Sequence, residues 1–247
     1  MNKYHALILS IIITLLIACN VYILSIVQQP TLTAFTIIEI KDGDTIVTDK
    51  QEVLRLANIN APEKNFFNSN QSYFFLKQYE NKTIFMQPIE KDRYQRTVAR
   101  IFSSNKKYLN LELVKLGLSS KFLVQDSETS DFAKAEQNAI SQSLGIWQHS
   151  DYYGCLSAEI DKYNEFLIIT NNCHYLLKDL IIKDESRKTL KISELLPGKT
   201  HISSFIGENN KTTIFFNSKT NIWNNDRDTL YVFDKNGFIV YSLSYGY

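Results

Sequence analysis

Three short segments of the chain carry charged side chains whose types suit chemistry on a phosphate. Asp42 and Asp44 share one predicted turn, and paired carboxylate oxygens are the ligands that Ca²⁺ or Mg²⁺ prefers. Arg55 lies between Leu54 and Leu56, so on a strand its guanidinium points to the face opposite both leucines. A guanidinium in that position needs an anionic partner or an anionic ligand.

A third carboxylate and a second guanidinium complete the set. Pro62 fixes the backbone just before Glu63 and so favours a defined direction for that carboxylate. Arg96 offers a second fork for phosphate oxygens. Each signal alone usually has a structural explanation, such as a plain turn or a surface ion pair. Together they supply positive charge for a phosphodiester and a base for the attacking water.

The elements that must position these residues are short strands followed by helices. Runs such as TIIEI, TIVT and EVLRLANI, broken by turn residues, predict an antiparallel meander from Thr36 onward. Helical patterns are predicted over 69–80, 109–116 and 131–143. In the last of these, Asp131 is a predicted N-cap and Gly145 a C-terminal stop. Residues 36–150 therefore form one predicted α+β domain.

Composition excludes several classes of protein. The 247 residues are 44% hydrophobic and 13% aromatic, which suffices for ordinary cores and excludes wholesale disorder. The net charge of +1 gives no global basic field that would attract nucleic acid, and 8 Gly with 4 Pro exclude collagen-like repeats. Any function must come from local groups of residues.

The motifs of residues 36–148 resemble the staphylococcal nuclease, or thermonuclease, family in order and spacing. The resemblance implies a five-stranded OB-fold barrel with three helices and Ca²⁺-dependent hydrolysis of phosphodiester bonds in DNA and RNA. The segments that carry it are DGDTI, LRLANINAPE, DRYQRTVARIF, NLELVKLGLSSKF and AEQNAISQSLGIW.

The resemblance assigns a role to each motif residue. Arg55 and Arg96 match the two arginines that bind the scissile phosphate and stabilise its transition state, and Glu63 matches the proposed general base. Asp44 matches the first Ca²⁺ carboxylate. The other matching positions are a second metal ligand, a backbone carbonyl ligand, an acidic residue that reaches the metal through water, and a tyrosine of the nucleotide site: Asn60, Ala61, Asp42 and Tyr94.

Several positions depart from the family pattern. Asn60 replaces a carboxylate, which keeps a coordinating oxygen but predicts weaker Ca²⁺ binding. Gln95 replaces a glycine, so this turn is predicted to be strained or altered in a way that re-aims Arg96. Phe122, Leu123 and Gln125 stand where tyrosines usually approach the base, which predicts reduced stacking.

The N-terminal segment predicts export. Residues 6–27 contain no charge and would span ~33 Å as a helix, and Lys3 precedes them. The positive-inside rule then places the N-terminus in the cytoplasm and the rest outside, on the extracellular side of the membrane or secreted. Three alternatives remain for residues 1–30: an uncleaved signal anchor, a cleaved signal peptide, or a lipoprotein signal in which Cys19 of LIAC is lipidated.

Residues 155–247 predict a second, all-β domain. Short apolar runs recur with polar breaks, and Asn236-Gly237 is typical of a hairpin turn. In an oxidising compartment, Cys155 and Cys173 are a candidate disulfide; two buried thiols are the alternative. Residues 200–244, with FIVYSLSY near their end, are similar to lamin-tail domains. That similarity implies an immunoglobulin-like β-sandwich without catalysis, whose partner is unknown.

These interpretations lead to two hypotheses. The first is an exported Ca²⁺-dependent nuclease that leaves 3′-phosphate ends, with the membrane contacted through the N-terminal segment. The alternative is a membrane-tethered module that binds nucleic acid or protein without cutting.

Overall fold

The computed structural model describes all residues except 1–2, 28–30, 64–66, 125, 187 and 211. Its first unit, Met1–Thr33, consists mainly of the helix α1, Lys3–Val27. Cys19 is exposed on this helix and forms no disulfide. No helix among the described residues combines the length and the apolar character needed to cross a membrane. The signal anchor and lipoprotein assignments of residues 1–30, part of which lies outside the described residues, stay predictions.

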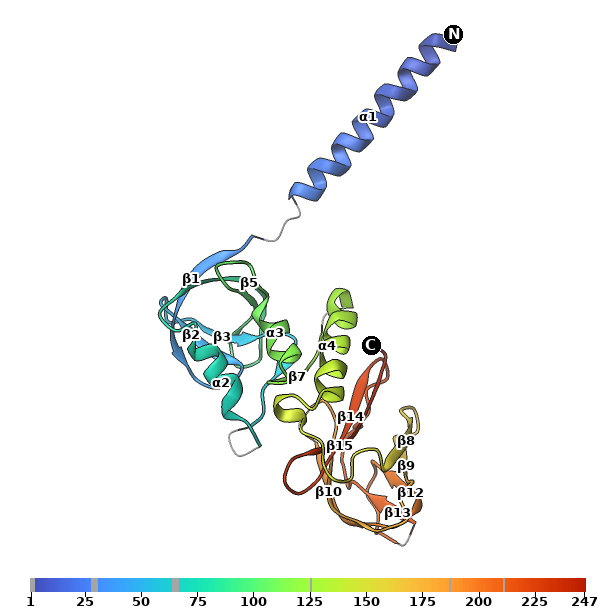
Figure 1. The fold of residues 1–247 in the computed structure, drawn as a ribbon. Helices are drawn as coiled ribbons and strands as arrows, with labels where there is room; N and C mark the ends of the chain where they lie inside the picture. The colour runs from blue at the N-terminus through green and yellow to red at the C-terminus, as the bar shows by residue number, and fades with distance from the viewer. Residues whose placement is uncertain (1–2, 28–30, 64–66, 125, 187, 211) are drawn as a thin grey trace. The chain divides into compact units, whose positions relative to one another are not determined.

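The second unit, Ala34–Tyr247, begins with a closed five-stranded barrel in the order β1-β2-β3-β6-β5 (Figure 1). Buried and partly buried side chains alternate along β6, so one of its faces lies toward the barrel core. The strands are β1 Thr33–Ile40, β2 Thr45–Thr48, β3 Val53–Leu56, β5 Thr83–Lys91 and β6 Thr97–Phe102.

Three helices and a two-stranded pairing accompany the barrel. Helices α2 Asn70–Lys77 and α3 Leu109–Lys115 fall inside the ranges predicted from the sequence. Helix α4 runs Thr129–Ser141 and its N-cap residue is Glu128. The prediction of Asp131 as the N-cap was therefore wrong, since Asp131 lies in the first turn of the helix. It ends before Gly145, which instead begins the 3₁₀ turn η2, Gly145–Trp147. The short strands β4 Ile59–Asn60 and β7 Ser120–Lys121 pair antiparallel.

The prediction of an OB-like α+β barrel is thus confirmed.

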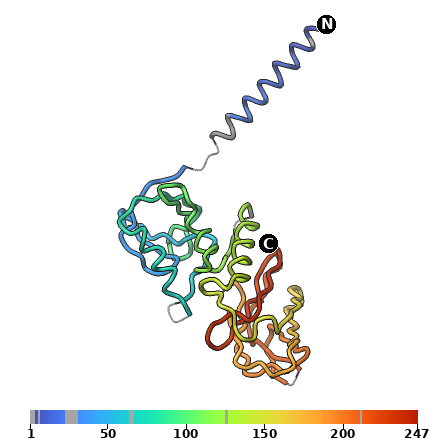
Figure 2. Tube along the Cα trace, in the orientation of Figure 1, coloured from blue at the N-terminus to red at the C-terminus, as the bar shows by residue number. Residues whose placement is uncertain are grey.

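After η2 the chain continues into β-structure, and its path can be followed in Figure 2. Two four-stranded sheets, in the orders β11-β10-β14-β15 and β13-β12-β9-β8, enclose a core that includes Leu167, Ile182 and Leu230. Their strands are β8 Leu156–Asp161, β9 Phe166–Asn171, β10 Leu177–Lys183, β11 Thr189–Leu195, β12 Gly198–Ser203, β13 Thr213–Phe215, β14 Asp228–Phe233 and β15 Ile239–Tyr245.

The β14–β15 pair is a hairpin whose turn has Gly237 at φ +84°, as the Asn-Gly sequence predicts. Cys155 and Cys173 form a disulfide with Cα atoms 5.2 Å apart. The all-β character of this part is confirmed, whereas its lamin-tail identity stays a prediction. The boundary predicted between 150 and 155 lies inside one compact unit, and the two-domain division is likewise still a prediction.

A buried ion pair joins the barrel side of this unit to the sandwich. Lys121 in β7 is fully buried, and its ammonium donates to Glu136 of α4 at 2.6 Å and to Thr229 of β14 at 2.6 Å. Glu185, which follows β10, lies 3.3 Å from the same nitrogen. Burial raises the pKa of Glu185, and the charge of Lys121 opposes that rise.

An apolar cluster lies beside this ion pair. Ala139 and Ile140 of α4 pack with Trp147, Tyr231 and Ile239. The side chain of Tyr231 donates to Glu136 at 2.9 Å, so the cluster and the ion pair share one hydrogen-bonded network. The contact surface between helix and sandwich is therefore both buried and specific.

Lys121→Met is expected to destabilise the protein by about 3–5 kcal/mol, because it leaves two buried carboxylates without their cation. The loss should be larger at alkaline than at acidic pH. A carboxylate whose pKa is raised in the folded state costs stability once pH rises above its unfolded pKa. Denaturant unfolding at several pH values measures this.

Lys115→Met is the matched control, because the partner of Lys115 is Glu112 in an exposed pair at 3.3 Å. Its effect should stay within roughly 0.5 kcal/mol. Equal losses for the two variants would contradict the importance assigned to the buried pair.

Candidate active site

The turn before β2 holds Asp44 in a buried position against the segment that follows β4. The backbone N–H of Ala61 donates to Asp44 Oδ2 at 2.8 Å, and the Thr45 hydroxyl donates to Asp44 Oδ1 at 3.1 Å. Gly43 is required here, since a Cβ would meet Ser72 Oγ at 2.1 Å and the Ala61 Cβ at 2.6 Å. The close approach of these segments is what buries the carboxylate.

Arg55 reaches the same carboxylate from the neighbouring strand. Residues Thr45 and Arg55 are register partners in the β2–β3 pair. One guanidinium nitrogen lies 3.3 Å from Asp44 Oδ2 and 3.5 Å from Asn60 Oδ1, and the other donates to the Leu56 carbonyl at 2.6 Å. The structure therefore brings Asp44, Arg55 and Asn60 together, as the sequence predicted.

The electrostatics of Asp44 reflect its burial. Removal from water raises the pKa of Asp44, the charge of Arg55 opposes this, and the charge of Asp42 adds to it. Asp42 itself is exposed, and its Oδ1 accepts a hydrogen bond from the Asp44 backbone N–H at 3.0 Å. A further positive charge beside Asp44 would favour its ionised form.

The second arginine, Arg96, lies in the turn between β5 and β6. Arg96 forms a salt bridge with Asp92, both Nε and Nη2 lying 2.7 Å from Oδ2. Its guanidinium also lies over the ring of Tyr94, 5.5 Å from the centroid, and that ring is exposed. Partial burial would raise the pKa of Asp92, but hydrogen bonds from Arg96 and Tyr94 outweigh it and lower the pKa.

The backbone at Gln95 has the altered conformation that the sequence predicts. Gln95 adopts φ +64°, the left-handed region that glycine occupies without strain. Its neighbour Arg96 is oriented by Asp92, a residue to which the sequence analysis assigned no role. The spacing of an aspartate four residues before an arginine across a turn was the available signal.

Arg55 and Arg96 line one cavity of about 180 Å³. The remaining lining mixes apolar side chains, among them Phe122 and Leu123, with Asp92 and Glu90. Two guanidinium groups on one concave surface can hold an anion with several oxygens, such as a phosphate group. Gln125, the third position named beside Phe122, lies outside the described residues.

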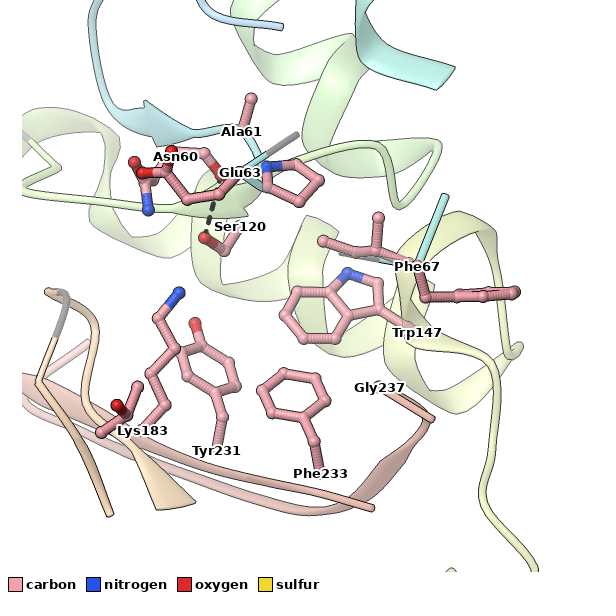
Figure 3. Close-up of a pocket in the computed structure, with 13 residues that line it drawn as sticks. Asn60, Ala61, Glu63, Phe67, Ser120, Trp147, Lys183, Tyr231, Phe233 and Gly237 are labelled. Atoms are coloured by element: carbon pink, nitrogen blue, oxygen red, sulfur yellow. Dashed lines mark hydrogen bonds between the residues drawn. The ribbon is translucent and has the colours of Figure 1, made fainter. Parts of the chain in front are cut away.

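Glu63 lines a different cavity, together with Asn60 and Ala61 (Figure 3). The segment containing Asn60 is held from the opposite side, because the Ser120 hydroxyl donates to the Asn60 carbonyl at 3.1 Å. Glu63 is exposed. The structure thus brings the two arginines together in one cavity and places Glu63 on the lining of another; Asn60, which lies beside Arg55, also lines the second cavity.

The donor set fits a hard cation held by few protein ligands. Asp44 and the amide of Asn60 present oxygens, which suit Ca²⁺ or Mg²⁺. A carboxylate has about four lone-pair sites, and Asp44 uses three of them in the contacts above. Within the described part of the chain, no group of three or more His, Cys, Asp or Glu side chains gathers as a metal site. A cation here would need water for most of its ligands.

Comparisons with known proteins agree with this geometry. The family model described as "Staphylococcal nuclease homologue" matches residues 53–149. The chain is similar to an uncharacterized endonuclease of Escherichia coli, at 28% identity over 120 residues that cover 47% of this chain and 77% of that protein. An uncharacterized protein of Methanocaldococcus jannaschii is 24% identical over 148 residues, covering 47% of this chain and 72% of its own length.

The family match begins within the barrel, at β3, and ends just after η2. It includes Arg55, Glu63 and Arg96, whereas Asp42 and Asp44 precede it. The closed barrel, the paired arginines and this match support a nuclease hydrolase, and residues 53–149 of the chain form a staphylococcal nuclease domain.

Proposed function

We propose that this protein hydrolyses phosphodiester bonds of DNA and RNA in a reaction that depends on a divalent cation, with Ca²⁺ as the natural metal. The observation that carries the proposal is the shared cavity of Arg55 and Arg96, next to the segment that bears Glu63. Cleavage leaves 3′-phosphate ends. The resemblance of the motifs to the nuclease family supports this direction of attack.

The two arginines stabilise charge on the phosphoryl oxygens. Arg55 is held by Asp44, Asn60 and the Leu56 carbonyl, so its guanidinium needs little reorganisation when an anion arrives. Arg96 is oriented by Asp92 and can exchange part of that salt bridge for phosphate. Tyr94, beside Arg96, contributes a ring to nucleotide binding.

Glu63 acts as the general base that takes a proton from the attacking water. Pro62 fixes the backbone just before it, and the proposal requires the phosphate held by the two arginines to come within reach of the Glu63 carboxylate. Asp44, the Asn60 side chain and the Ala61 carbonyl would hold the cation, with Asp42 acting through water. When bound, the cation supplies positive charge toward the phosphate oxygens and their surroundings.

We also propose that the helix α1 directs the chain to the outer side of the cell membrane. The charge-free run of residues 6–27 supports this, and an extracellular Ca²⁺ concentration would suit a site with weak binding of roughly 10⁻⁴–10⁻³ M. Fractionation of cells that express the full chain tests it, with protease accessibility of the β-rich part as the readout. Cys19→Ser changes the membrane-bound share only if Cys19 is lipidated.

Glu63→Gln is expected to lower kcat by about 10²–10⁴-fold, because the general base is lost while the side chain keeps its shape. Binding of nucleic acid should persist. The measurement is cleavage of plasmid DNA in Ca²⁺ and in chelator, with gel retardation run in parallel.

Glu39→Gln, on the exposed part of β1, is the control and should cleave like the natural protein. DNA that is retarded but intact with the natural chain, in Ca²⁺ and in chelator alike, would instead favour a binding module. Unchanged cleavage by Glu63→Gln would remove Glu63 from the mechanism.

Asp44→Asn is expected to stabilise the cation-free protein at neutral pH. The raised pKa of Asp44 means that its ionised form costs stability above the unfolded pKa, and the amide removes that cost. The gain should fade as pH falls toward the ordinary range of an aspartate. Thermal unfolding in chelator across pH measures it, and added Ca²⁺ should stabilise the natural chain but not the variant.

Asp92→Asn is the matched control with the opposite sign. Because the pKa of Asp92 is lowered, its ionised form adds stability at neutral pH, and the amide should reduce it. An Asp44→Asn variant that is less stable than the natural protein in chelator would mean that the Arg55 salt bridge outweighs the burial of the carboxylate.

A further inference from the structure

The cavity beside Glu63 is built by residues from both the barrel side and the sandwich. It measures about 140 Å³, and Figure 3 shows the segment of Asn60 and Glu63 on one side and the sheet with Tyr231 and Phe233 on the other. This cavity is distinct from the one that Arg55 and Arg96 line. The role proposed above for Glu63 does not explain the other residues that line this cavity.

Stacked aromatic rings form one wall of the cavity. Trp147 lies with its ring centroid 5.3 Å from that of Tyr231 at an interplanar angle of 24°, and 6.2 Å from that of Phe233 at 13°. Trp147 and Tyr231 are almost fully buried against each other, so the ring surface open to a flat heterocycle is that of the partly exposed Phe233. Phe67 lines another part of the cavity.

A buried hydrogen-bond donor of this wall has no acceptor among the described residues. The indole nitrogen of Trp147 is buried, and the residue as a whole is 1% exposed. In Figure 3 the nitrogen edge of the ring is turned toward the segment of Glu63, away from the sheet that carries Tyr231. An unpaired buried N–H costs free energy, so this edge suits a ligand that brings an acceptor.

A positive charge borders the same cavity. Lys183, at the end of β10, is partly exposed, and Figure 3 shows its side chain running from the sandwich toward the barrel side of the cavity. Thr189, its register partner in β11, is an exposed part of the lining. The ligand that fits these walls combines a flat ring with an acceptor on the ring edge, and its backbone lies near both Lys183 and Glu63.

We propose that this cavity is a nucleobase subsite to which the sandwich contributes. The bound base belongs to a nucleotide next to the phosphate held by Arg55 and Arg96, so the proposal rests on the proposed function. A cavity of about 150 Å³ accommodates one benzene ring, which makes a pyrimidine the base that fits. A carbonyl oxygen of the pyrimidine accepts from Trp147, and Lys183 faces the sugar-phosphate backbone.

Tryptophan fluorescence tests binding independently of cleavage. The chain has 2 Trp, and Trp223 lies in the sandwich core outside the cavity lining. In the full chain with Trp223→Phe, Trp147 is the sole emitter, and Glu63→Gln in the same chain limits cleavage. Titration with a short oligothymidylate in Ca²⁺ should change the emission in a saturable way. An oligomer of abasic sugar-phosphates should bind without that change.

The two possible failures give different results. If neither oligomer alters the emission while the natural chain cleaves oligothymidylate, the subsite is refuted and the nuclease function stands. If only oligothymidylate alters the emission but the natural chain cleaves nothing, the subsite stands and the nuclease function fails. Equal changes with both oligomers would also refute recognition of the base.

A variant that fills the mouth of the cavity gives a second test. Thr189→Phe should raise KM for oligothymidylate by about 5- to 100-fold, the loss expected for one stacked base, with kcat unchanged. KM for the abasic oligomer should not move. Thr220→Phe, at an exposed sandwich position outside the lining, is the control. An unchanged KM with Thr189→Phe, or an equal rise for both oligomers, would overturn the proposal.

Discussion

The buried salt bridge of Lys121 is the interaction on which both parts of the site depend. Lys121 follows Ser120 in β7, and Ser120 donates to the backbone carbonyl of Asn60, whose side-chain oxygen accepts from Arg55. The backbone N–H of Lys121 and its ammonium both donate to Glu136, while Tyr231 donates to the same carboxylate. One carboxylate of α4 therefore fixes a strand next to the phosphate site and a ring of the second cavity.

Burial of these charges costs free energy, and that cost makes the packing of α4 on the sandwich specific. Two carboxylates face one ammonium, and burial raises the pKa of Glu185. The hydroxyl of Tyr247 donates to Glu185 at 2.5 Å, and its ring lies 4.4 Å from the Lys121 ammonium, so Tyr247 also belongs to this network. An alternative docking of helix on sheet would leave these charges without partners, and their desolvation would not be compensated.

The sequence predicted the barrel, and the convergence of Asp44, Arg55 and Asn60, because their signals are local. Short runs of β-branched and apolar residues indicate strands such as β6, and the turn residues Asp42 to Asp44 lie directly before β2. The roles of Lys121, Glu136 and Trp147 could not be predicted in this way. Their partners are up to 123 positions away in the chain, as for Lys121 and Ser244, and nothing in the spacing of the residues marks such a contact.

The same limit explains why no site residue was predicted in the sandwich. Tyr231 and Phe233 belong to a continuous apolar run in β14, and Lys183 ends β10; these patterns predict burial without saying what lies opposite. Only the packing of the sandwich on η2 brings Trp147 against two of these rings. Here residues of the sandwich line the same cavity as Glu63. In the proposed subsite the sandwich contacts the base of the substrate, whereas the arginines contact its phosphate.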